Sequence, residues 1–114
     1  MRVYVAGPLN PTKCEDRASE YLDNVRNMID ASIKLLRAGH SPYCPALVYQ
    51  YLVTEPVPIS MIIKSNFDFL DCCDAILLTG DWENSVGSVK ESQRAIELGI
   101  PIYTRINDLL GEKR

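Results

Sequence analysis

Short apolar strands alternate with amphipathic helices along this chain, and that alternation restricts the possible folds more than any other feature of the sequence. Residues 74–79 form the most continuous apolar run, which ends at Gly80. Such a run is typical of a central parallel strand that is buried on both faces. Residues 2–6 form a second short apolar strand, which is closed by Gly7 and Pro8. Both segments therefore predict strands from the middle of a sheet.

A long amphipathic helix is predicted over residues 15–38, because apolar side chains recur there at steps of three or four residues. Gly39 follows at the position where a helix is commonly terminated. The apolar stripe that we expect to face the core consists of Leu22, Val25, Ile29, Ile33 and Leu36.

The remaining elements are weaker in pattern. Residues 41–47 contain Pro42 and Pro45, so the strand predicted there belongs at a sheet edge, where a missing N–H donor is tolerated. Residues 48–58 show no sustained period and predict an irregular segment with one helical turn. We further expect helices over 60–72 and 88–98, the second capped by Gly99, a fourth strand over 100–104 and a short helix over 106–110.

Alternating strands and helices with short links predict an α/β fold. The expected architecture is a three-layer sandwich, flavodoxin-like or Rossmann-like, with a central, mainly parallel sheet of about four to five strands. The 114 residues and 12.8 kDa fit one domain over residues 1–114. With a strand order of 2-1-3-4, the order reverses between the strands at 2–6 and 74–79. Ligands of such sheets bind outside the carboxyl ends of the strands at that point.

Charge and composition exclude several partners. Twelve Lys and Arg against fifteen Asp and Glu give a net charge of −3, so no cationic surplus is available for nucleic-acid phosphates. No apolar run approaches the roughly 20 residues that span a bilayer, and the N-terminus lacks a signal-peptide core, so we expect a cytoplasmic protein without a membrane partner. In such a compartment the four cysteines, Cys14, Cys44, Cys72 and Cys73, are expected to be free thiols rather than disulfides or metal ligands.

Two polar, glycine-containing loops, residues 7–10 and 80–88, are expected to meet at the switch point. Backbone amides at the start of the helix after the second loop, with the hydroxyls of Ser85 and Ser88, form a candidate anion cradle. The simpler interpretation is that these serines cap the helix. Trp82 in the same loop either stacks on a planar ligand or packs on the loop beneath it.

Glu91 is the carboxylate that we expect beside the pocket formed by these two loops. We place it in the first turn of the helix predicted from residue 88, where the helix dipole favours the ionised form. An ionised carboxylate beside a pocket suits nucleophilic attack or stabilisation of a cation. The spacing of Ser88 and Glu91 also matches a capping box, in which the glutamate hydrogen-bonds back to the backbone. Local sequence leaves both interpretations open.

Together these residues resemble the nucleoside 2-deoxyribosyltransferase-like superfamily. The resemblance covers most of the chain and is carried by residues 4–8, 70–76 and 82–102, above all by Gly87, Glu91, Ala95, Gly99 and Pro101. It implies that Glu91 attacks the anomeric carbon of the sugar and forms a covalent glycosyl-enzyme. It further implies that the Tyr4 hydroxyl orients Glu91 and that Gly7 belongs to a loop approaching the sugar and its 5′ substituent.

The residue six positions before Glu91 separates two branches of this superfamily. Nucleoside transferases tend to carry an aspartate there, whereas nucleoside-monophosphate N-glycosidases carry a serine that binds the phosphate; this chain has Ser85. A hydroxyl at a helix N-terminus donates to a phosphate that a carboxylate would repel. The resemblance therefore implies a nucleoside 5′-monophosphate as substrate. Its phosphate cradle would consist of Gly7, Pro8, Leu9 and Asn10 together with Ser85, Gly87 and Ser88.

The chain departs from the superfamily at Asn66, where an aspartate is usual. Asparagine hydrogen-bonds a base but cannot act as its general acid, and Asp68 lies roughly 200° further around the helix. Protonation of the leaving base is thus unassigned, with Asp81, Glu83 and water as alternatives.

The expected function is hydrolysis of the N-glycosidic bond of a nucleoside 5′-monophosphate, with Glu91, Tyr4 and Asn66 at the reacting centre and no metal or organic cofactor. The alternatives are base exchange by a nucleoside 2-deoxyribosyltransferase and a nucleotide-binding module without catalysis. Sites in this superfamily are usually completed by a neighbouring subunit, so the resemblance implies a homodimer or larger homo-oligomer. We expect its contact surface around residues 60–72 and 48–58.

Overall fold

The computed structural model describes residues 1–10 and 16–111. Its centre is a four-stranded sheet in which every neighbouring pair is parallel and the order is β2-β1-β3-β4. This is the predicted strand order, so the topological switch lies between β1 and β3. The strands are β1 (Arg2–Ala6), β2 (Ser41–Tyr43), β3 (Ala75–Leu78) and β4 (Ile102–Tyr103).

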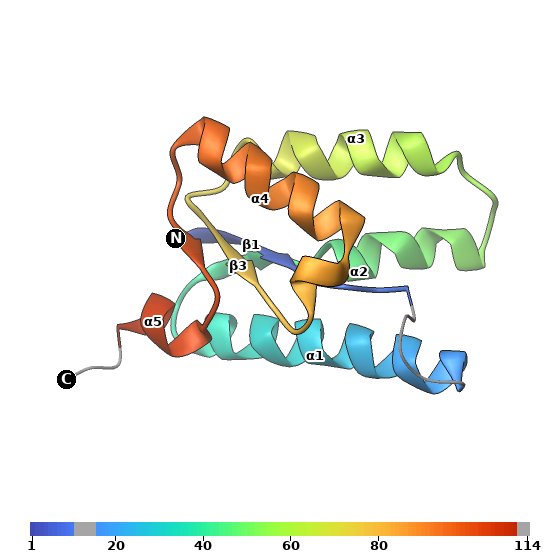
Figure 1. Ribbon diagram of the computed structural model, residues 1–114, viewed down its shortest axis with the longest axis horizontal. Helices are drawn as coiled ribbons and strands as arrows, with labels where there is room; N and C mark the ends of the chain where they lie inside the picture. The colour runs from blue at the N-terminus through green and yellow to red at the C-terminus, as the bar shows by residue number, and fades with distance from the viewer. Residues whose placement is uncertain (11–15, 112–114) are drawn as a thin grey trace.

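Helices cover both faces of the sheet, as Figure 1 shows, with α1 on one side and α3 and α4 on the other. The three-layer α/β architecture is therefore confirmed. The helices are α1 (Arg17–Arg37), α2 (Pro45–Val48), α3 (Ile59–Leu70), α4 (Val86–Leu98) and α5 (Ile106–Leu110), with 3-10 turns η1 (Tyr49–Val53) and η2 (Trp82–Asn84). Within residues 1–10 and 16–111, no helix combines the length and the hydropathy that crossing a bilayer requires.

The sheet divides the core into two halves because successive side chains of a strand point to opposite faces. Val3 and Val5 of β1 pack on the α1 side, in a cluster that includes Met28. Tyr4 and Ala6 face the other way, in the cluster beneath α3 and α4. The central strands β1 and β3 are covered on both sides, which explains why their sequences are apolar at nearly every position.

The predicted core stripe of α1 is wrong. The buried residues of this helix are Met28, Ser32 and Leu35, whereas Leu22 is 56% exposed and Leu36 is 60% exposed. Ser32 tolerates burial because its hydroxyl donates to the carbonyl of Met28 at 2.8 Å, so no polar atom is left unpaired. The buried face thus carries two large apolar side chains with a serine between them, and the serine interrupts its apolar pattern.

Two strands are shorter than predicted. The segment expected as a strand over 41–47 is extended only to Tyr43, because Pro45 begins α2, and proline is well suited to the first position of a helix. Its position at the sheet edge is confirmed. The strand expected over 100–104 is reduced to Ile102–Tyr103.

The other predicted elements agree closely with the structure. Helix α4 is capped by Gly99, which has φ +73°; α5 has the predicted bounds, and α3 begins one residue earlier and ends two residues earlier than predicted. The long helix predicted over 15–38 is α1, whose N-cap Asp16 accepts from the backbone N–H of Ser19; residue 15 lies outside the described part of the chain. The segment 48–58 carries the single turn η1, as expected.

Candidate functional site

Tyr4 and Glu91 form a hydrogen-bonded pair beneath the helices on one face of the sheet. Tyr4 is completely buried at the middle of β1, and its hydroxyl donates to Oε2 of Glu91 on α4. Burial raises the pKa of Glu91 to about 7, although the hydrogen bond from Tyr4 acts to lower it. Burial, followed by the charge of Glu91, raises the pKa of Tyr4 well above its usual value. The site thus contains a carboxyl group that titrates near neutrality and a phenol that keeps its proton.

The start of α4 differs from the prediction, and this changes how Glu91 is placed. The helix begins at Val86 rather than at residue 88, and its N-cap is Ser85, whose hydroxyl accepts from the backbone N–H of Ser88 at 3.2 Å. The capping box predicted between Ser88 and Glu91 is therefore wrong, and so is the placement of Glu91 in the first turn. Glu91 is the sixth residue of α4, and it is held by Tyr4 rather than by the helix terminus.

The three cradle residues at the start of α4 differ in accessibility. Ser85 is half-buried, Gly87 is exposed, and nothing lies within 4 Å of the position that a Cβ at Gly87 would take. Ser88 is only 1% exposed, and its hydroxyl has no hydrogen-bond partner among the described residues. The open approach to this helix terminus therefore lies at Ser85 and Gly87, where backbone N–H groups at the start of a helix lack intrahelical acceptors.

Asn66 faces the interior from α3 and is 2% exposed. Its Oδ1 accepts a hydrogen bond of 3.0 Å from the Tyr43 hydroxyl. Asp68, two residues further on, is exposed and hydrogen-bonds Lys64 at 2.8 Å. As the helical spacing predicted, the asparagine and not the aspartate is turned inward.

Two tyrosines that the sequence analysis did not select belong to this cluster. Tyr43 lies opposite Tyr4 in the register of β1 and β2, and its ring stacks on that of Tyr4 with the centroids 5.6 Å apart. Burial is the main cause that raises the pKa of Tyr43 and of Tyr49, and the charge of Glu91 contributes to both. A hydrogen bond with Asn66 acts in the opposite direction on Tyr49. Tyr43 could have been selected from the sequence, because it lies on the strand predicted at the sheet edge, and side chains of neighbouring strands interact on one face.

The two predicted loops do meet at the switch point. Thr79 donates to the carbonyl of Ala6 through both its backbone N–H, at 2.8 Å, and its hydroxyl, at 2.9 Å. A Cβ on Gly7 would overlap the Thr79 hydroxyl, so glycine permits the ends of β1 and β3 to approach each other. Pro8 lies against Gly80, within 4 Å of the position of a Cβ there.

The first loop is not directed toward Glu91 along its whole length. Leu9 packs against the core cluster on the α1 side, and its carbonyl accepts from Nδ2 of Asn24 at 3.1 Å. Asn10 is exposed. Of the four cradle residues in this loop, Leu9 thus contributes its side chain to the opposite layer of the fold.

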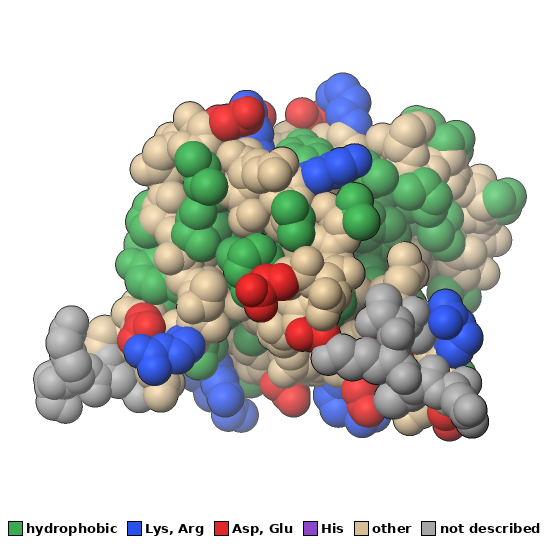
Figure 2. All heavy atoms as spheres, viewed as in Figure 1, with side chains coloured by type: hydrophobic (Ala, Val, Ile, Leu, Met, Phe, Trp, Pro, Cys, Tyr) green, Lys and Arg blue, Asp and Glu red, His purple; other side chains and the backbone are tan. Residues whose placement is uncertain are grey.

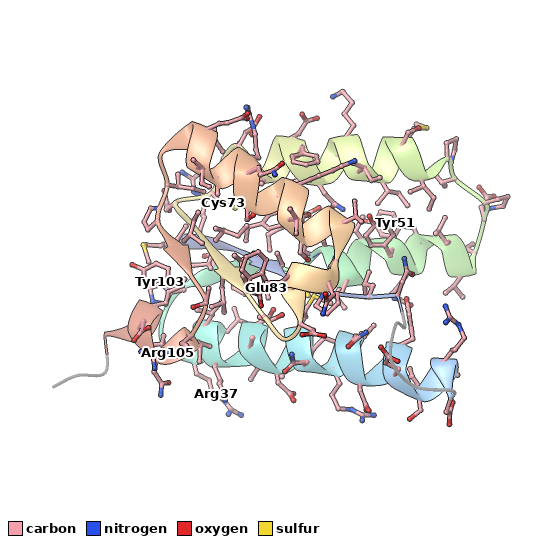
Figure 3. The ribbon with its side chains drawn as sticks, viewed as in Figure 1. Arg37, Tyr51, Cys73, Glu83, Tyr103 and Arg105 are labelled. Atoms are coloured by element: carbon pink, nitrogen blue, oxygen red, sulfur yellow. The ribbon has the colours of Figure 1, made fainter. Side chains whose placement is uncertain are left out.

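The second loop folds into the turn η2. Trp82 is half-buried and packs against the cluster that contains Tyr4, which agrees with the packing interpretation of this residue. Asp81 accepts from the side chain of Asn84 at 3.0 Å. Glu83 is exposed on η2, and Figure 3 shows its side chain well apart from Tyr51 of η1.

A cavity of about 280 Å³ lies elsewhere, on the α1 side of the sheet. Its walls come from α1, the end of β3 and the segment around Thr104, and Glu91 does not line it. Among the described cysteines, Cys44 is buried, Cys73 is half-buried and Cys72 is exposed, and all three are free; Cys14 lies outside the described residues. No group of three or more His, Cys, Asp or Glu side chains suited to a metal occurs in residues 1–10 and 16–111.

Comparisons with known proteins bear on the fold and on the family. The family described as a domain of unknown function, DUF4406, matches residues 1–104. No curated protein matches the chain significantly. Among solved structures, the chain is similar to a 2-deoxyribosyltransferase from Bacillus psychrosaccharolyticus, with a TM-score of 0.56 and 16% sequence identity, over 90% of this chain and 69% of that one. At that identity the likeness shows a shared fold. The fold is the one that the resemblance implied, while the superfamily's chemistry and its branch stay predictions.

Proposed function

We propose that this chain, which belongs to the DUF4406 family of domains of unknown function, hydrolyses the N-glycosidic bond of a ribo- or deoxyribonucleoside 5′-monophosphate. The observation that carries the proposal is the partly buried hydrogen bond from Tyr4 to Glu91 on the face of the sheet beneath α4. A carboxylate that is fixed by a neighbouring donor and shielded from water is suited to attack an electrophilic carbon. The 2-deoxyribosyltransferase fold adds support for chemistry at a glycosidic carbon.

The reaction would proceed in two steps, as in retaining glycosidases. Glu91 attacks C1′ of the sugar, the bond from C1′ to the base nitrogen breaks, and a sugar ester of Glu91 forms. Water then attacks C1′ and releases the sugar phosphate with the carboxylate restored. Tyr4 holds the attacking carboxylate in one orientation through both steps, because its raised pKa keeps the donating proton in place.

The phosphate would lie at the start of α4. Ser85 accepts from the backbone N–H of Ser88 and thereby keeps its own hydroxyl proton available for donation to an anion. The exposed Gly87 leaves room for an anion to approach the backbone N–H groups of the first turn. A hydroxyl at this position favours a 5′-monophosphate over a nucleoside.

Substitution of Ser85 by aspartate is expected to reverse this preference. A carboxylate retains the helix cap but repels a phosphate, so kcat/KM for monophosphates should fall by roughly 10²-fold while that for nucleosides does not fall. Ser19→Asp, at an exposed position on α1, is the matched control and should change neither value. Chromatography of the released base from a panel of monophosphates and nucleosides measures the effect. Cleavage of nucleosides alone by the unchanged chain would contradict the phosphate site.

A nucleoside 2-deoxyribosyltransferase is the second candidate, favoured because the similar solved structure is that of a 2-deoxyribosyltransferase. The two candidates share the glycosyl-Glu91 intermediate and differ in whether water or a second base resolves it. Adding a free base to the panel separates them. Faster formation of a new nucleoside than of free sugar would favour the transferase.

We also propose that a second copy of the chain covers the surface formed by α3 and η1. Figure 2 shows apolar side chains gathered over this region of the visible face. Among its apolar residues, Tyr51 is 65% exposed, Val53 is 82% exposed and Met61 is 61% exposed. Exposed apolar patches of this kind often mark interfaces. Light scattering should therefore give about twice the 12.8 kDa of the chain, and Met61→Glu should return the mass to that of one chain. A single-chain mass for the unchanged protein would contradict the dimer.

A further inference from the structure

The tyrosines around Glu91 are poor proton donors for a leaving base, while Asp81 accepts from Asn84 and Glu83 is exposed on η2. Tyr4 from β1, Tyr43 from β2 and Tyr49 from η1 each have a pKa that responds to the charge of Glu91. In each, burial is the main cause of a pKa raised above that of an ordinary phenol. The Tyr4 proton is in addition held by the Glu91 carboxylate itself. These phenols therefore keep their protons near neutral pH rather than release them.

Asn66 is fixed in an orientation that offers hydrogen bonds but no proton. The Tyr43 hydroxyl occupies Oδ1 of Asn66 at 3.0 Å, so the amide nitrogen is turned the other way. A hydrogen bond from Asn66 acts to lower the pKa of Tyr49, as expected when the amide nitrogen donates to the phenol oxygen. An amide N–H donates a hydrogen bond to an acceptor on a base, but it does not transfer its proton near neutral pH.

Aromatic rings extend from this cluster to the surface. Tyr43 stacks on Tyr4 at 5.6 Å and on Phe69 at 4.6 Å, with interplanar angles of 29° and 12°. Phe69 is half exposed on α3. Tyr4 is fully buried and Tyr43 is stacked between Tyr4 and Phe69, so Phe69 carries the aromatic face of this group that a ligand can reach. An aromatic face attracts planar cations, and a desolvated carboxylate such as Glu91 attracts them further.

We propose that the site cleaves nucleotides whose base carries a positive charge on its ring, such as an N-alkylated purine or an N-substituted pyridinium. The inference rests on the proposed N-glycosidase function and names the substrate class of that same site. It follows from the juxtaposition of a buried carboxylate and stacked aromatic rings with an amide fixed at Asn66.

The reaction balances without a general acid. Glu91 attacks C1′, and the pair of electrons of the breaking bond moves to the ring nitrogen, which neutralises the cation and releases a neutral base. Water then adds to C1′ as the bond to Glu91 breaks, and its surplus proton passes to solvent. The sum is one cationic nucleotide and one water giving a neutral base, a sugar phosphate and one proton. A neutral base would instead require a proton on departure.

A cationic ring also prepares the nucleophile. An opposite charge beside a carboxyl group favours its ionised form. Arrival of the substrate therefore shifts Glu91, whose pKa is about 7 in the free protein, toward the attacking carboxylate.

The test compares 7-methylguanosine 5′-monophosphate and nicotinamide mononucleotide with guanosine 5′-monophosphate, each corrected for its uncatalysed rate. We expect the unchanged protein to accelerate cleavage of the two cationic nucleotides at least 10²-fold more than that of the neutral one. Asn66→Asp, which supplies an acid, should raise kcat/KM for the neutral nucleotide at least tenfold. The difference in acceleration between cationic and neutral nucleotides should therefore become smaller. Tyr49→Phe should change cleavage of the neutral and the cationic nucleotides by the same factor, because it removes a hydroxyl from the site but no acid. Thermal unfolding reports whether Asn66→Asp folds. If it does not, the comparison of neutral and cationic nucleotides in Tyr49→Phe tests the inference in its place.

The outcomes separate this inference from the proposed function. Equal acceleration of the neutral and cationic nucleotides, abolished by Glu91→Gln, overturns the inference and leaves the N-glycosidase standing. Loss of neutral-base cleavage in Tyr49→Phe also overturns it, because Tyr49 would then be the acid. Absence of base release from all three nucleotides overturns both.

Discussion

Replacing Glu91 with glutamine should reduce base release from a nucleoside monophosphate by at least about 10³-fold, because the substitution removes the nucleophile and leaves its shape. The glutamine oxygen still accepts the hydrogen bond from Tyr4, so the fold around β1 is preserved. Single-turnover measurement of the released base, together with calorimetric binding of the product sugar phosphate, distinguishes lost chemistry from lost binding. We expect the first to disappear and the second to remain.

The matched control for this substitution lies on the same helix. Glu97 is exposed on α4, where its carboxylate pairs with Arg94 at 3.2 Å. Glu97→Gln removes the same charge from the same element and should alter base release by less than about twofold. Equal losses in the two variants would mean that Glu91 acts through the charge of the helix and not as a nucleophile.

The second large effect is on stability. The pKa of Glu91 is about 7 in the folded protein, above the value near 4.5 of an unperturbed glutamate. The folded state therefore holds a proton that the unfolded chain has lost, so the stability due to this group is complete below about pH 4.5 and is lost as pH rises through about 7. At pH 8 the ionised carboxylate must be kept in a desolvated site, and Glu91→Gln should be more stable than the unchanged protein by on the order of 1–3 kcal/mol.

Urea unfolding at pH 5 and at pH 8 measures this difference. The advantage of Glu91→Gln should shrink toward zero at pH 5, because the unchanged side chain is then protonated in the folded protein. Glu97→Gln, at a surface position, should show no comparable dependence on pH. An advantage of Glu91→Gln that is the same at both values would contradict the raised pKa.

The same pKa sets the expected dependence of activity on pH. The attacking form of Glu91 is ionised, so kcat/KM should rise as pH increases through about 7. Ionisation of Glu91 with rising pH thus both forms the attacking nucleophile and lowers the stability of the fold. A buried carboxylate is costly to the fold, and its retention is consistent with a functional role.

Sequence periodicity was sufficient to predict the central strands of the sheet, but it did not predict which face of α1 is buried. Two continuous apolar runs, residues 2–6 and 74–79, need cover on both faces, which predicts that these two strands are central. In α1, large apolar side chains predicted the wrong face, because contact with the sheet is made by Met28, Ser32 and Leu35. Which of two neighbouring stripes of a helix is buried depends on the shape of the opposing surface, which a single sequence does not contain.

Within the site, the positions of Glu91 and Tyr4 were predictable, but the cause of their alignment was not. The sequence suggested a helix start at residue 88, whereas Ser85 caps a helix that begins at Val86. Two serines three residues apart offer equivalent local caps, so tertiary contacts select between them. The presence of Tyr49 near Glu91 could not be predicted for a related reason, because Tyr49 comes from the turn η1 in a segment without sequence periodicity.

Detection of the sugar ester on Glu91 would test the central claim most directly. A nucleoside 5′-monophosphate carrying fluorine at the 2′ position should form the ester and lose it slowly, since an electron-withdrawing group opposes the cation-like transition state. After acid quenching, mass spectrometry should show the protein heavier by one fluorinated sugar phosphate, carried by the peptide that contains Glu91 and absent in Glu91→Gln. Base release without any covalent species, accompanied by inversion at C1′, would contradict the account.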